Sequence, residues 1–351
     1  MPAPRSKTAI VTGATGQDGY FLVGRLLAEG WTVHAAVRNV AAATALFGGH
    51  DRFVAVERDL RDPGPLATLV RDVRPEELYN LAGESSVSAS FDDPRATWET
   101  NAHVVVRLLD AVRKDSPGTR VYQASSGEMF GSTPGGDVVH DERSALSPQS
   151  PYAAAKAAAH MLCHSYRESY GVRIACGVLF NHESHRRGPR FLSRKVVDHL
   201  HMLEEQGQRT PLFVGNLKAQ RDWGYAPDYV DGMILALRQT AVRDVADEPS
   251  SYRDYVLGTG TLHTVWELID VAFALAGHRL EWELDDVDPL AWHAIFAETG
   301  ELAVGVDRAF VRPADPRAIA ADPSLIRAEL GWQPRVGLDV FLRDMLETRS
   351  A

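Results

Sequence analysis

Several features are scarce in this sequence of 351 residues, and each absence excludes a class of protein. Two cysteines, Cys163 and Cys176, are too few for a disulfide framework or a cysteine-rich zinc site. No apolar run approaches the roughly 18 residues of a membrane-spanning helix. The net charge of −10 leaves no cationic excess for binding nucleic acid or an anionic membrane. Residues 1–7 are polar and lead straight into a predicted strand, so we expect no signal peptide and a cytoplasmic protein.

Several catalytic motifs are also missing. The sequence contains neither the G-x-S-x-G of many serine hydrolases nor the G-x-x-x-x-G-K-[ST] of phosphate-binding loops. His160 and His164 have the helical spacing of metal ligands, but H-E-x-x-H and an obvious third ligand are absent. These absences argue against a serine hydrolase, a P-loop kinase and a metal site.

The residues that are present are those of a globular protein, 45% apolar and 24% charged, with a length that suits one large domain or two intertwined ones. Predicted strands and helices alternate over residues 1–181, which indicates an α/β fold with a Rossmann-like, doubly wound parallel sheet. Residues 182–351 mix short helices and strands, and we interpret them as a smaller, mainly substrate-binding α/β part intertwined with the first. The predicted strands cover residues 7–12, 32–37, 53–57, 77–81, 120–125 and 173–179, and the longer predicted helices cover 63–73, 94–114 and 152–170.

A glycine-rich turn follows the first predicted strand. Gly13, Gly16 and Gly19 stand between that strand and a predicted helix that ends near residue 29. Glycines permit a tight turn and let the backbone approach a pyrophosphate, which also meets the positive end of the helix dipole. The order favours a dinucleotide-binding unit over a purely structural turn, although the spacing is G-x-x-G-x-x-G rather than G-x-G-x-x-G.

The ends of the next strands bear on the cofactor. After the second strand, an acid holds the ribose 2′-hydroxyl of NAD, whereas an arginine suits the 2′-phosphate of NADP. Arg38 therefore favours NADP, the alternative being a solvent-exposed surface arginine. Asp59 and Leu60 follow the third strand, where an adenine pocket is expected. Small residues after the fourth strand, such as Ala82, let a cofactor pass close to the backbone.

The stretch S-P-Y-A-A-A-K at residues 150–156 carries a candidate base. Alanine is the best helix former, so a helix is expected here. Tyr152 and Lys156 are four residues apart and therefore share a helix face. We expect the ammonium group to lower the pKa of the phenol, so that Tyr152 can act as a base near neutral pH. The alternative is an exposed helix start with an unrelated tyrosine and lysine.

Other polar residues stand beyond the carboxyl ends of predicted strands, where parallel sheets bind ligands. Ser126 and Glu128 follow the fifth strand, although Glu128 could instead cap the next segment. Residues 185–195 hold five arginines or lysines, which fits either a pocket for a phosphate-bearing ligand or a solvated basic loop. Arg221 and Arg312 add isolated arginines in turn-like contexts.

These motifs resemble those of the extended short-chain dehydrogenase/reductases, and among them the GDP-mannose 4,6-dehydratase family. The broader likeness rests on T-G-A-T-G-Q-D-G at 12–19, N-L-A at 80–82, Ser126, and Tyr152 with Lys156. The narrower likeness adds S-P-Y-A-x-A-K at 150–156, Y-R-E-S-Y-G at 166–171, L-F-N-H-E-S-x-R-R-G at 179–188, R-D-W-G at 221–224, R-P-x-D at 312–315 and G-W-x-P at 331–334. The likeness covers nearly the whole chain, and N-H-E-S-x-R-R-G is its most specific element.

The resemblance implies a dehydratase of a nucleotide sugar, GDP-mannose above all, that keeps NADP bound and regenerates it in each turnover. Tyr152, aided by Lys156, is implied to take the proton of the sugar 4-hydroxyl as hydride leaves C4. Glu128 is implied to remove the C5 proton before water leaves C6, and Ser126 to bond the 4-oxygen. The implied cofactor contacts are Gly13, Thr15, Gly16, Gln17, Asp18, Gly19, Arg38, Asp59, Leu60, Leu81, Ala82, Ser85, Tyr152, Lys156, His182 and Arg187. The implied substrate contacts are Ser126, Asn181, Lys195, Arg221 and Arg312.

The chain departs from the family pattern near the sugar. The family's Ala-Ala-Gln-Ser-His is Ala82-Gly83-Glu84-Ser85-Ser86 here, and Gly127 replaces a serine, which we expect to loosen the catalytic loop. Asn39 replaces a second arginine, and the segment after it is shorter; in the family this loop reaches a neighbouring subunit's cofactor. Another hexose, a heptose or another nucleotide therefore stays open, as does the choice between a homodimer and a homotetramer.

Two other functions also stay open. An NADPH-dependent reductase or epimerase of nucleotide sugars would consume cofactor or leave C6 oxygenated. A non-enzymatic cofactor-binding sensor, which this fold also supports, would have no need of Glu128 or Tyr152.

Overall fold

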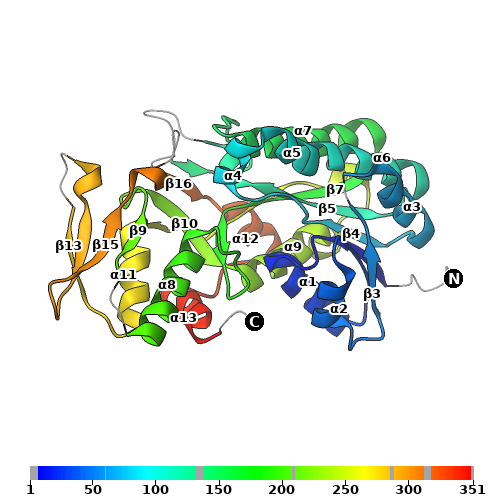
Figure 1. Ribbon diagram of the computed structural model, residues 1–351. Helices are drawn as coiled ribbons and strands as arrows, with labels where there is room; N and C mark the ends of the chain where they lie inside the picture. Colours follow the sequence, from blue (N-terminus) through cyan, green and yellow to red (C-terminus); the bar gives the residue numbers. More distant parts are fainter. Residues whose placement is uncertain are drawn as a thin grey trace.

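The computed structural model describes residues 7–59, 61–131, 138–207, 210–284, 288–311 and 318–348. Its centre is a sheet of seven parallel strands in the order β11-β7-β5-β4-β1-β2-β3, which confirms the predicted α/β class and doubly wound sheet (Figure 1). The chain moves from β1 outwards to β3 and then returns to β4, so the carboxyl ends of β1 and β4 form the switch point where such sheets bind ligands. The strands are β1 (Thr8–Thr12), β2 (Thr32–Val37), β3 (Phe53–Glu57), β4 (Glu77–Asn80), β5 (Arg120–Ser126), β7 (Arg173–Leu179) and β11 (Tyr255–Leu257).

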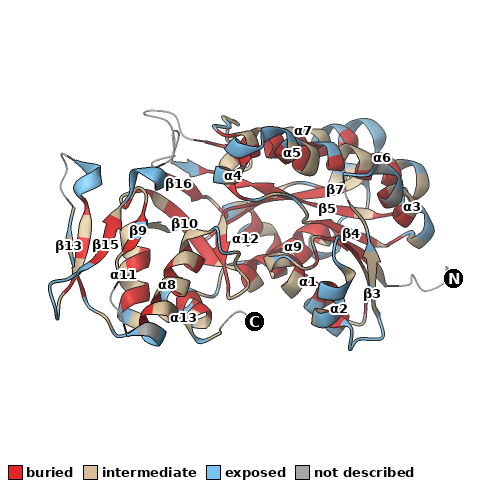
Figure 2. Ribbon diagram, viewed as in Figure 1, coloured by how far each residue is buried: buried red, intermediate tan, exposed pale blue. Residues whose placement is uncertain are grey.

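Helices cover both faces of this sheet (Figure 1). One layer contains α1 (Gln17–Ala28), α2 (Val40–Phe47), α9 (Ala226–Leu237) and α12 (Ser324–Leu330). The other contains α3 (Pro63–Val73), α4 (Val87–Asp92), α5 (Pro94–Trp98), α6 (Val104–Asp115) and α7 (Pro151–Tyr170). Their apolar faces turn inward: Leu22 of α1 and Leu108 of α6 are fully buried. The strands between the two layers are mostly buried, except the edge strand β3, whose residues are half-buried or exposed (Figure 2).

The predicted helix over residues 94–114 differs most from the structure. It begins as α5, passes through one π-helical turn, η1 (Glu99–His103), and continues as α6. A π-helical turn shifts the side chains that follow it and is rarely visible in sequence. It contains the buried Asn101, which borders the site described below. The short helix α4 was not predicted, and the strand expected to end at Leu81 ends at Asn80.

The large sheet also needs residues from the second half of the chain. β11 pairs with β7, and α9 packs against α1, β5 and β7. The ring of Tyr229 in α9 stacks on His182, with ring centres 4.5 Å apart, and meets the ring of Trp332 edge-on at 5.7 Å. Trp332 in turn donates to the carbonyl oxygen of Asp228 at 2.8 Å. Residues near the end of the chain therefore support the underside of the sheet.

The smaller part lies beyond the carboxyl ends of the large sheet, at the left in Figure 1. One of its sheets has the order β12-β10-β16-β6 with β8 beside β10, and the other has the order β13-β14-β15-β9. The strands are β6 (Val139–His140), β8 (Asn181–Glu183), β9 (Leu212–Val214), β10 (Gln220–Tyr225), β12 (Leu262–Thr264), β13 (Leu280–Glu283), β14 (His293–Phe296), β15 (Leu302–Val306) and β16 (Ala318–Ala321). Its longer helices are α8 (Leu192–Gln206), α11 (Val265–Leu275) and α13 (Leu338–Glu347), which pack around one apolar core.

Short helical turns complete the described chain. They are α10 (Gln239–Val242), η2 (Gly127–Met129), η3 (Pro249–Ser251), η4 (Pro289–Ala291) and η5 (Arg308–Phe310). None of the helices in the described ranges is both long enough and apolar enough to cross a membrane.

Candidate active site

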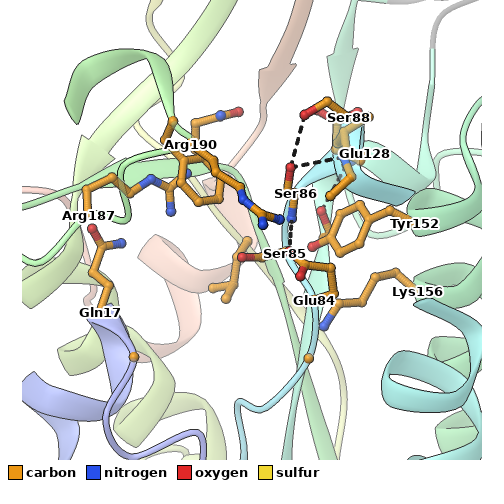
Figure 3. A pocket seen from close by; sticks show the side chains of 18 of the residues that line it. Gln17, Glu84, Ser85, Ser86, Ser88, Glu128, Tyr152, Lys156, Arg187 and Arg190 are labelled. Carbon is orange, nitrogen blue, oxygen red and sulfur yellow. Dashed lines mark hydrogen bonds between the residues drawn. The ribbon is translucent and has the colours of Figure 1, made fainter. Parts of the chain in front are cut away.

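The carboxyl ends of the large sheet border a cavity of about 1360 Å³. Its walls come from the turns after β1 to β5, from the start of α7, and from β8, α8, β10 and η5 of the smaller part. In Figure 3, Tyr152 and Glu128 line one side, and Arg187 and Arg190 line the opposite side. A ligand in this cavity would contact both parts of the chain.

Glycines shape the turn after β1 at positions where a side chain would collide with the backbone. Gly13 has a φ of +71°, and a Cβ atom there would lie 2.9 Å from the backbone nitrogen of Ala82. A Cβ atom at Gly19 would lie 2.1 Å from the carbonyl oxygen of Gly13. Gly16, the N-cap of α1, supplies no side-chain cap, so the first N–H groups of the helix can donate to an anion. The turn therefore fits the pyrophosphate of a dinucleotide.

Buried polar side chains tie the ends of three neighbouring strands together. Thr12 Oγ1 donates to Asn80 Oδ1 at 2.7 Å, and Asn80 Nδ2 donates to Gln123 Oε1 at 2.7 Å. Thr12 Oγ1 also accepts the backbone N–H of Ala82 at 3.1 Å. These bonds hold the turn after β4 against the turn after β1.

The helix α7 brings Tyr152 and Lys156 to the cavity, as their spacing predicts. Ser150 caps this helix by accepting the backbone N–H of Ala153 at 3.1 Å. Both side chains are buried. Lys156 Nζ donates to the carbonyl oxygen of Ala124 at 3.0 Å and lies 5.9 Å from the centre of the Tyr152 ring.

The expectation that Lys156 lowers the pKa of Tyr152 is wrong. Burial raises the pKa of Tyr152 to about 12, and a hydrogen bond with Ser126 offsets only part of this effect. Burial also lowers the pKa of Lys156 to about 8. The loss of hydration, which helical spacing does not reveal, outweighs the attraction between an ammonium and a phenolate.

Ser126 and Glu128 sit at the end of β5. Ser126 Oγ accepts the backbone N–H of Glu128 at 3.3 Å and so caps the turn η2. The Glu128 side chain lines the cavity near Tyr152 (Figure 3). Gly127 between them is buried under the ring of Phe180, which would lie 3.0 Å from a Cβ atom at this position. The glycine thus permits close packing here, and a looser catalytic loop stays a prediction.

Contacts within the chain also fix the unusual segment after β4. A Cβ atom at Gly83 would lie 2.3 Å from Asn101 Oδ1. Asn101 Nδ2 donates to the carbonyl oxygen of Glu84 at 3.1 Å, and Glu84 Oε1 accepts the backbone N–H of Ser86 at 3.0 Å. The π-helical turn that contains Asn101 therefore sets the position of this wall of the cavity.

An ion pair joins α1 to the smaller part. His182 Nε2 lies 3.0 Å from Asp18 Oδ1, while His182 Nδ1 donates to the carbonyl oxygen of Phe180 at 2.7 Å. Burial lowers the pKa of His182 and raises that of Asp18, but their mutual attraction outweighs burial, so the pKa of His182 is raised and that of Asp18 is lowered. Gln17 Nε2 donates to the carbonyl oxygen of His182 at 2.9 Å, and Ser184 Oγ donates to Gln17 Oε1 at 3.0 Å.

Charged side chains gather where β2 and β3 end. Arg38 follows β2, and Arg58 and Asp59 follow β3; all three line the cavity. Arg61 Nε donates to Asp59 Oδ1 at 3.0 Å, and its hydrogen bonds lower the pKa of Asp59 to about 2. Asn39, the departure noted after the second strand, caps α2 with its side chain.

The smaller part contributes further cations. Arg187 Nε lies 3.0 Å from Glu183 Oε2. Lys195 Nζ donates to the carbonyl oxygen of Phe213 at 2.7 Å, and burial lowers the pKa of Lys195. Arg221 is buried in β10 and lines the same wall.

Every predicted site residue that the structure describes lines this one cavity. They are Gly13, Thr15, Gly16, Gln17, Asp18, Gly19, Arg38, Asp59, Leu81, Ala82, Ser85, Ser126, Glu128, Tyr152, Lys156, Asn181, His182, Arg187, Lys195 and Arg221. Leu60 and Arg312 lie outside the described residues. The binding roles of all these residues stay predictions.

Sequence reasoning missed several residues of the lining. Arg58 follows β3 as Arg38 follows β2, so its position after a strand was the signal that could have identified it. Asn216 and Phe310 come from loops of the smaller part and carried no such signal.

One group of possible metal ligands in the described chain lies apart from the cavity lining. His160, Cys176 and Asp254 have ligand atoms within 4.8 Å of one another. Arg167 is ion-paired with Asp254, and His160 Nδ1 lies 3.0 Å from Ser125 Oγ. The guanidinium charge beside the carboxylate opposes a bound cation, so we interpret the group as a polar network that supports α7.

Comparison with known proteins identifies the family. The model of the GDP-mannose 4,6 dehydratase family matches residues 10–345. A GDP-mannose 4,6-dehydratase of Vibrio cholerae serotype O1 is 37% identical over 97% of this chain and 92% of its own length. GDP-mannose 4,6 dehydratase 2 of Arabidopsis thaliana is 38% identical over 97% of this chain and 86% of its own.

A solved structure supports the fold. The UDP-glucose 4-epimerase of Thermus thermophilus, solved in complex with NAD, superposes with a TM-score of 0.76 and is 26% identical, covering 97% of this chain and 98% of that one. Sequence likeness over nearly the full length, together with this fold, leads to one conclusion. The chain belongs to the GDP-mannose 4,6-dehydratase family.

Proposed function

We propose that this chain is an NADP-dependent nucleotide-sugar 4,6-dehydratase that converts GDP-mannose to GDP-4-keto-6-deoxymannose. The observation that carries the proposal is the position of Glu128, whose side chain lines the same cavity as Tyr152 and Lys156. A reductase has no need of a carboxylate at this point, whereas a dehydratase needs a base for a C–H proton. The names of the relatives agree with this choice.

Each polar residue of the cavity has a separate role in this reaction. A nicotinamide ring held in the cavity would supply the hydride chemistry between sugar C4 and C6. Tyr152 takes the proton of the 4-hydroxyl, and Ser126 bonds the 4-oxygen. The protonated form of Lys156 favours the phenolate of Tyr152, which is the minor form in the buried site and the form that accepts this proton. Glu128 then removes the C5 proton, which the 4-keto group has made acidic, and passes it to the C6 hydroxyl, which leaves as water.

The two ends of the cavity suit two different ligands. The glycine turn and Arg38 would hold the cofactor, with Arg38 on the 2′-phosphate. Lys195 and Arg221 would bind the diphosphate of the nucleotide sugar, and Asn181 would contact the sugar or its nucleotide. Both ring nitrogens of His182 already bond the protein, so its part in cofactor binding would be to hold Asp18 and the glycine turn.

One observation favours a second candidate, a dehydratase of a different nucleotide sugar. Glu84 and Ser86 stand where the family has an amide and an imidazole, and Gly83 can have no side chain because Asn101 occupies the space. These residues line the wall beside Glu128, so they alter the surface that a sugar would meet (Figure 3).

We also propose that the chain forms a homo-oligomer through its long helices. Met161 and Tyr170 of α7 are 63% and 55% exposed, which is unusual for large apolar side chains on a helix of the main layer. Light scattering of the purified protein would give the number of subunits.

The test is one incubation in deuterated water with GDP-mannose and a trace of NADP⁺, with the product identified by NMR. A 4-keto-6-deoxy product with deuterium at C5 and no net consumption of cofactor is the expected result. Stoichiometric consumption of NADPH, or a product that keeps its C6 oxygen, would support the reductase or epimerase instead. No conversion while cofactor stays bound would direct attention to other nucleotide sugars, which are tested in the same way.

A further inference from the structure

Two arginines lie side by side where adjacent strands end. β2 and β3 pair in parallel with Val37 opposite Glu57, so the next residues, Arg38 and Arg58, leave the sheet together. The backbone N–H of Arg58 donates to the carbonyl oxygen of Val37 at 2.7 Å, which extends the pairing to the first residue beyond β3. Both side chains line the cavity.

The charge balance at this end of the cavity is positive. Among the side chains after β2 and β3 that line the cavity, Arg38, Arg58 and Arg61 contribute three positive charges and Asp59 one negative charge, which leaves +2 there in a chain whose net charge is −10. Arg58 Nη1 also donates to the carbonyl oxygen of Glu57 at 2.6 Å. Like charges on neighbouring strand ends repel, and an anion between them would relieve that repulsion. A phosphate monoester carries about −1.5 to −2 charges at neutral pH, which matches this excess.

Asp59 follows β3 and not β2, where sites that select NAD have their acid, and its carboxylate is already engaged. Dinucleotide sites that select NAD use a carboxylate to accept hydrogen bonds from the ribose 2′-hydroxyl. Asp59 instead accepts hydrogen bonds from both Nε and Nη2 of Arg61, with Nε 3.0 Å from Oδ1. Asn39 caps α2, so it is also committed elsewhere. A ribose substituent at this end of the cavity would therefore meet arginines.

We propose that Arg58 is a second binding residue for the 2′-phosphate of NADP, acting beside Arg38. This inference rests on the proposed function and assigns part of its cofactor preference to a residue after β3. Two guanidinium groups can donate to different oxygens of one phosphate, and each adds charge-assisted hydrogen bonds. Both arginines come from the same chain, so a single subunit supplies both.

The experiment measures the dissociation constants of NADP⁺ and NAD⁺ for the full-length protein and three variants. Arg58→Gln removes the charge and keeps much of the side-chain length. Arg38→Gln does the same on the neighbouring strand end. Arg71→Gln is the matched control, because it removes one positive charge from an exposed position of α3 that does not line the cavity. Thermal unfolding without cofactor shows whether each variant folds.

We expect Arg58→Gln to weaken NADP⁺ binding by about 10- to 100-fold, the usual effect of losing hydrogen bonds to a charged group. NAD⁺ binding should stay the same within error, and Arg71→Gln should change neither constant. The salt dependence of NADP⁺ binding should also become weaker in Arg58→Gln, because fewer charges meet the phosphate.

Two results would overturn the inference in different ways. If the unaltered protein prefers NADP⁺ and Arg58→Gln keeps that preference in full, Arg58 does not bind the phosphate and the proposed function is unaffected. If the unaltered protein binds NAD⁺ as tightly as NADP⁺, the proposed cofactor itself is wrong. If Arg58→Gln does not fold, Arg58→Lys replaces it. The lysine keeps the positive charge but lacks the several N–H donors of a guanidinium group. The inference then requires a smaller loss of affinity for NADP⁺ and no loss of affinity for NAD⁺.

Discussion

The imidazole of His182 meets the carboxylate of Asp18 where α1 begins, with Nε2 3.0 Å from Oδ1. One residue opens the helix beside the glycine turn and the other lies in β8, which pairs with a strand of the smaller part. The pair therefore joins the expected pyrophosphate site to the smaller part of the chain. This pair and its neighbours in the cavity can each be tested by substitution.

Asp18→Asn should destabilise the fold in a pH-dependent manner. The pKa of Asp18 is lowered below its usual 3.8 and that of His182 is raised above its usual 6.5. The stabilisation is therefore complete between these two values, and it is lost as the pH rises through the higher pKa of folded His182. Urea unfolding should show a loss of about 2 kcal/mol at pH 5.5 and a smaller loss at pH 8.5. The exposed variant Asp51→Asn should show no such pH dependence, and an equal loss at both pH values for Asp18→Asn would refute the pairing.

Glu128→Gln should separate substrate binding from turnover. We expect turnover to fall about 10²- to 10⁴-fold, because the variant lacks the base for C5, while the dissociation constant of the nucleotide sugar changes little. Deuterium exchange at C5 measures the affected step directly. Glu84→Gln is the matched control, since this second carboxylate of the cavity bonds the backbone of Ser86, and it should keep C5 exchange. Near-normal turnover in Glu128→Gln would show that Glu128 is not the base that removes the C5 proton.

The rate should fall in alkaline solution as Lys156 loses its proton. Burial lowers the pKa of Lys156 to about 8, so above this pH the neutral amine no longer favours the phenolate of Tyr152. We expect kcat/KM to decline above about pH 8. Lys156→Arg should react more slowly at every pH but without this decline, because a guanidinium stays charged. If the same decline persists in Lys156→Arg, another group is titrating.

Gly83→Ala should be destabilising even though the change is small. The new Cβ atom would lie 2.3 Å from Asn101 Oδ1, inside the π-helical turn, so either the turn or the wall of the cavity must move. A cost of about 1–3 kcal/mol is usual for such crowding. Gly24→Ala in α1 is the control, because a Cβ atom there meets nothing within 4 Å, and it should be neutral or stabilising. Equal midpoints of thermal unfolding for the two variants would contradict the contact.

The features predicted correctly from the sequence are the local ones. The strands β2, β3 and β7 and the helix α3 have the expected bounds, because buried parallel strands and capped amphipathic helices are encoded within short windows. The face shared by Tyr152 and Lys156 follows from helical spacing alone. The sequence also predicts that the candidate site residues line one cavity, because side chains at the carboxyl ends of parallel strands lie close together.

The features that were missed depend on contacts between distant segments. The pKa of Tyr152 was misjudged because spacing reveals a neighbouring charge but not the loss of hydration around both groups. The π-helical turn is stabilised by the bonds of Asn101 to segments outside its own helix. Asn39 was noted as a missing arginine, although its side chain serves as a helix cap. Each case needed the three-dimensional arrangement.

The rings of His182, Tyr229 and Trp332 contact one another although these residues lie far apart in the sequence. The fold therefore cannot be completed until the last of them has been made. The ribosome makes the glycine turn more than 300 residues before Trp332. The edge strand β11 begins at Tyr255, so it is made long after β7, the strand with which it pairs. The nascent first half therefore displays an unpaired strand edge and an uncovered apolar face until α9 and β11 have also been made. Cells that express only the first half of this sequence should therefore accumulate aggregates in place of a working domain.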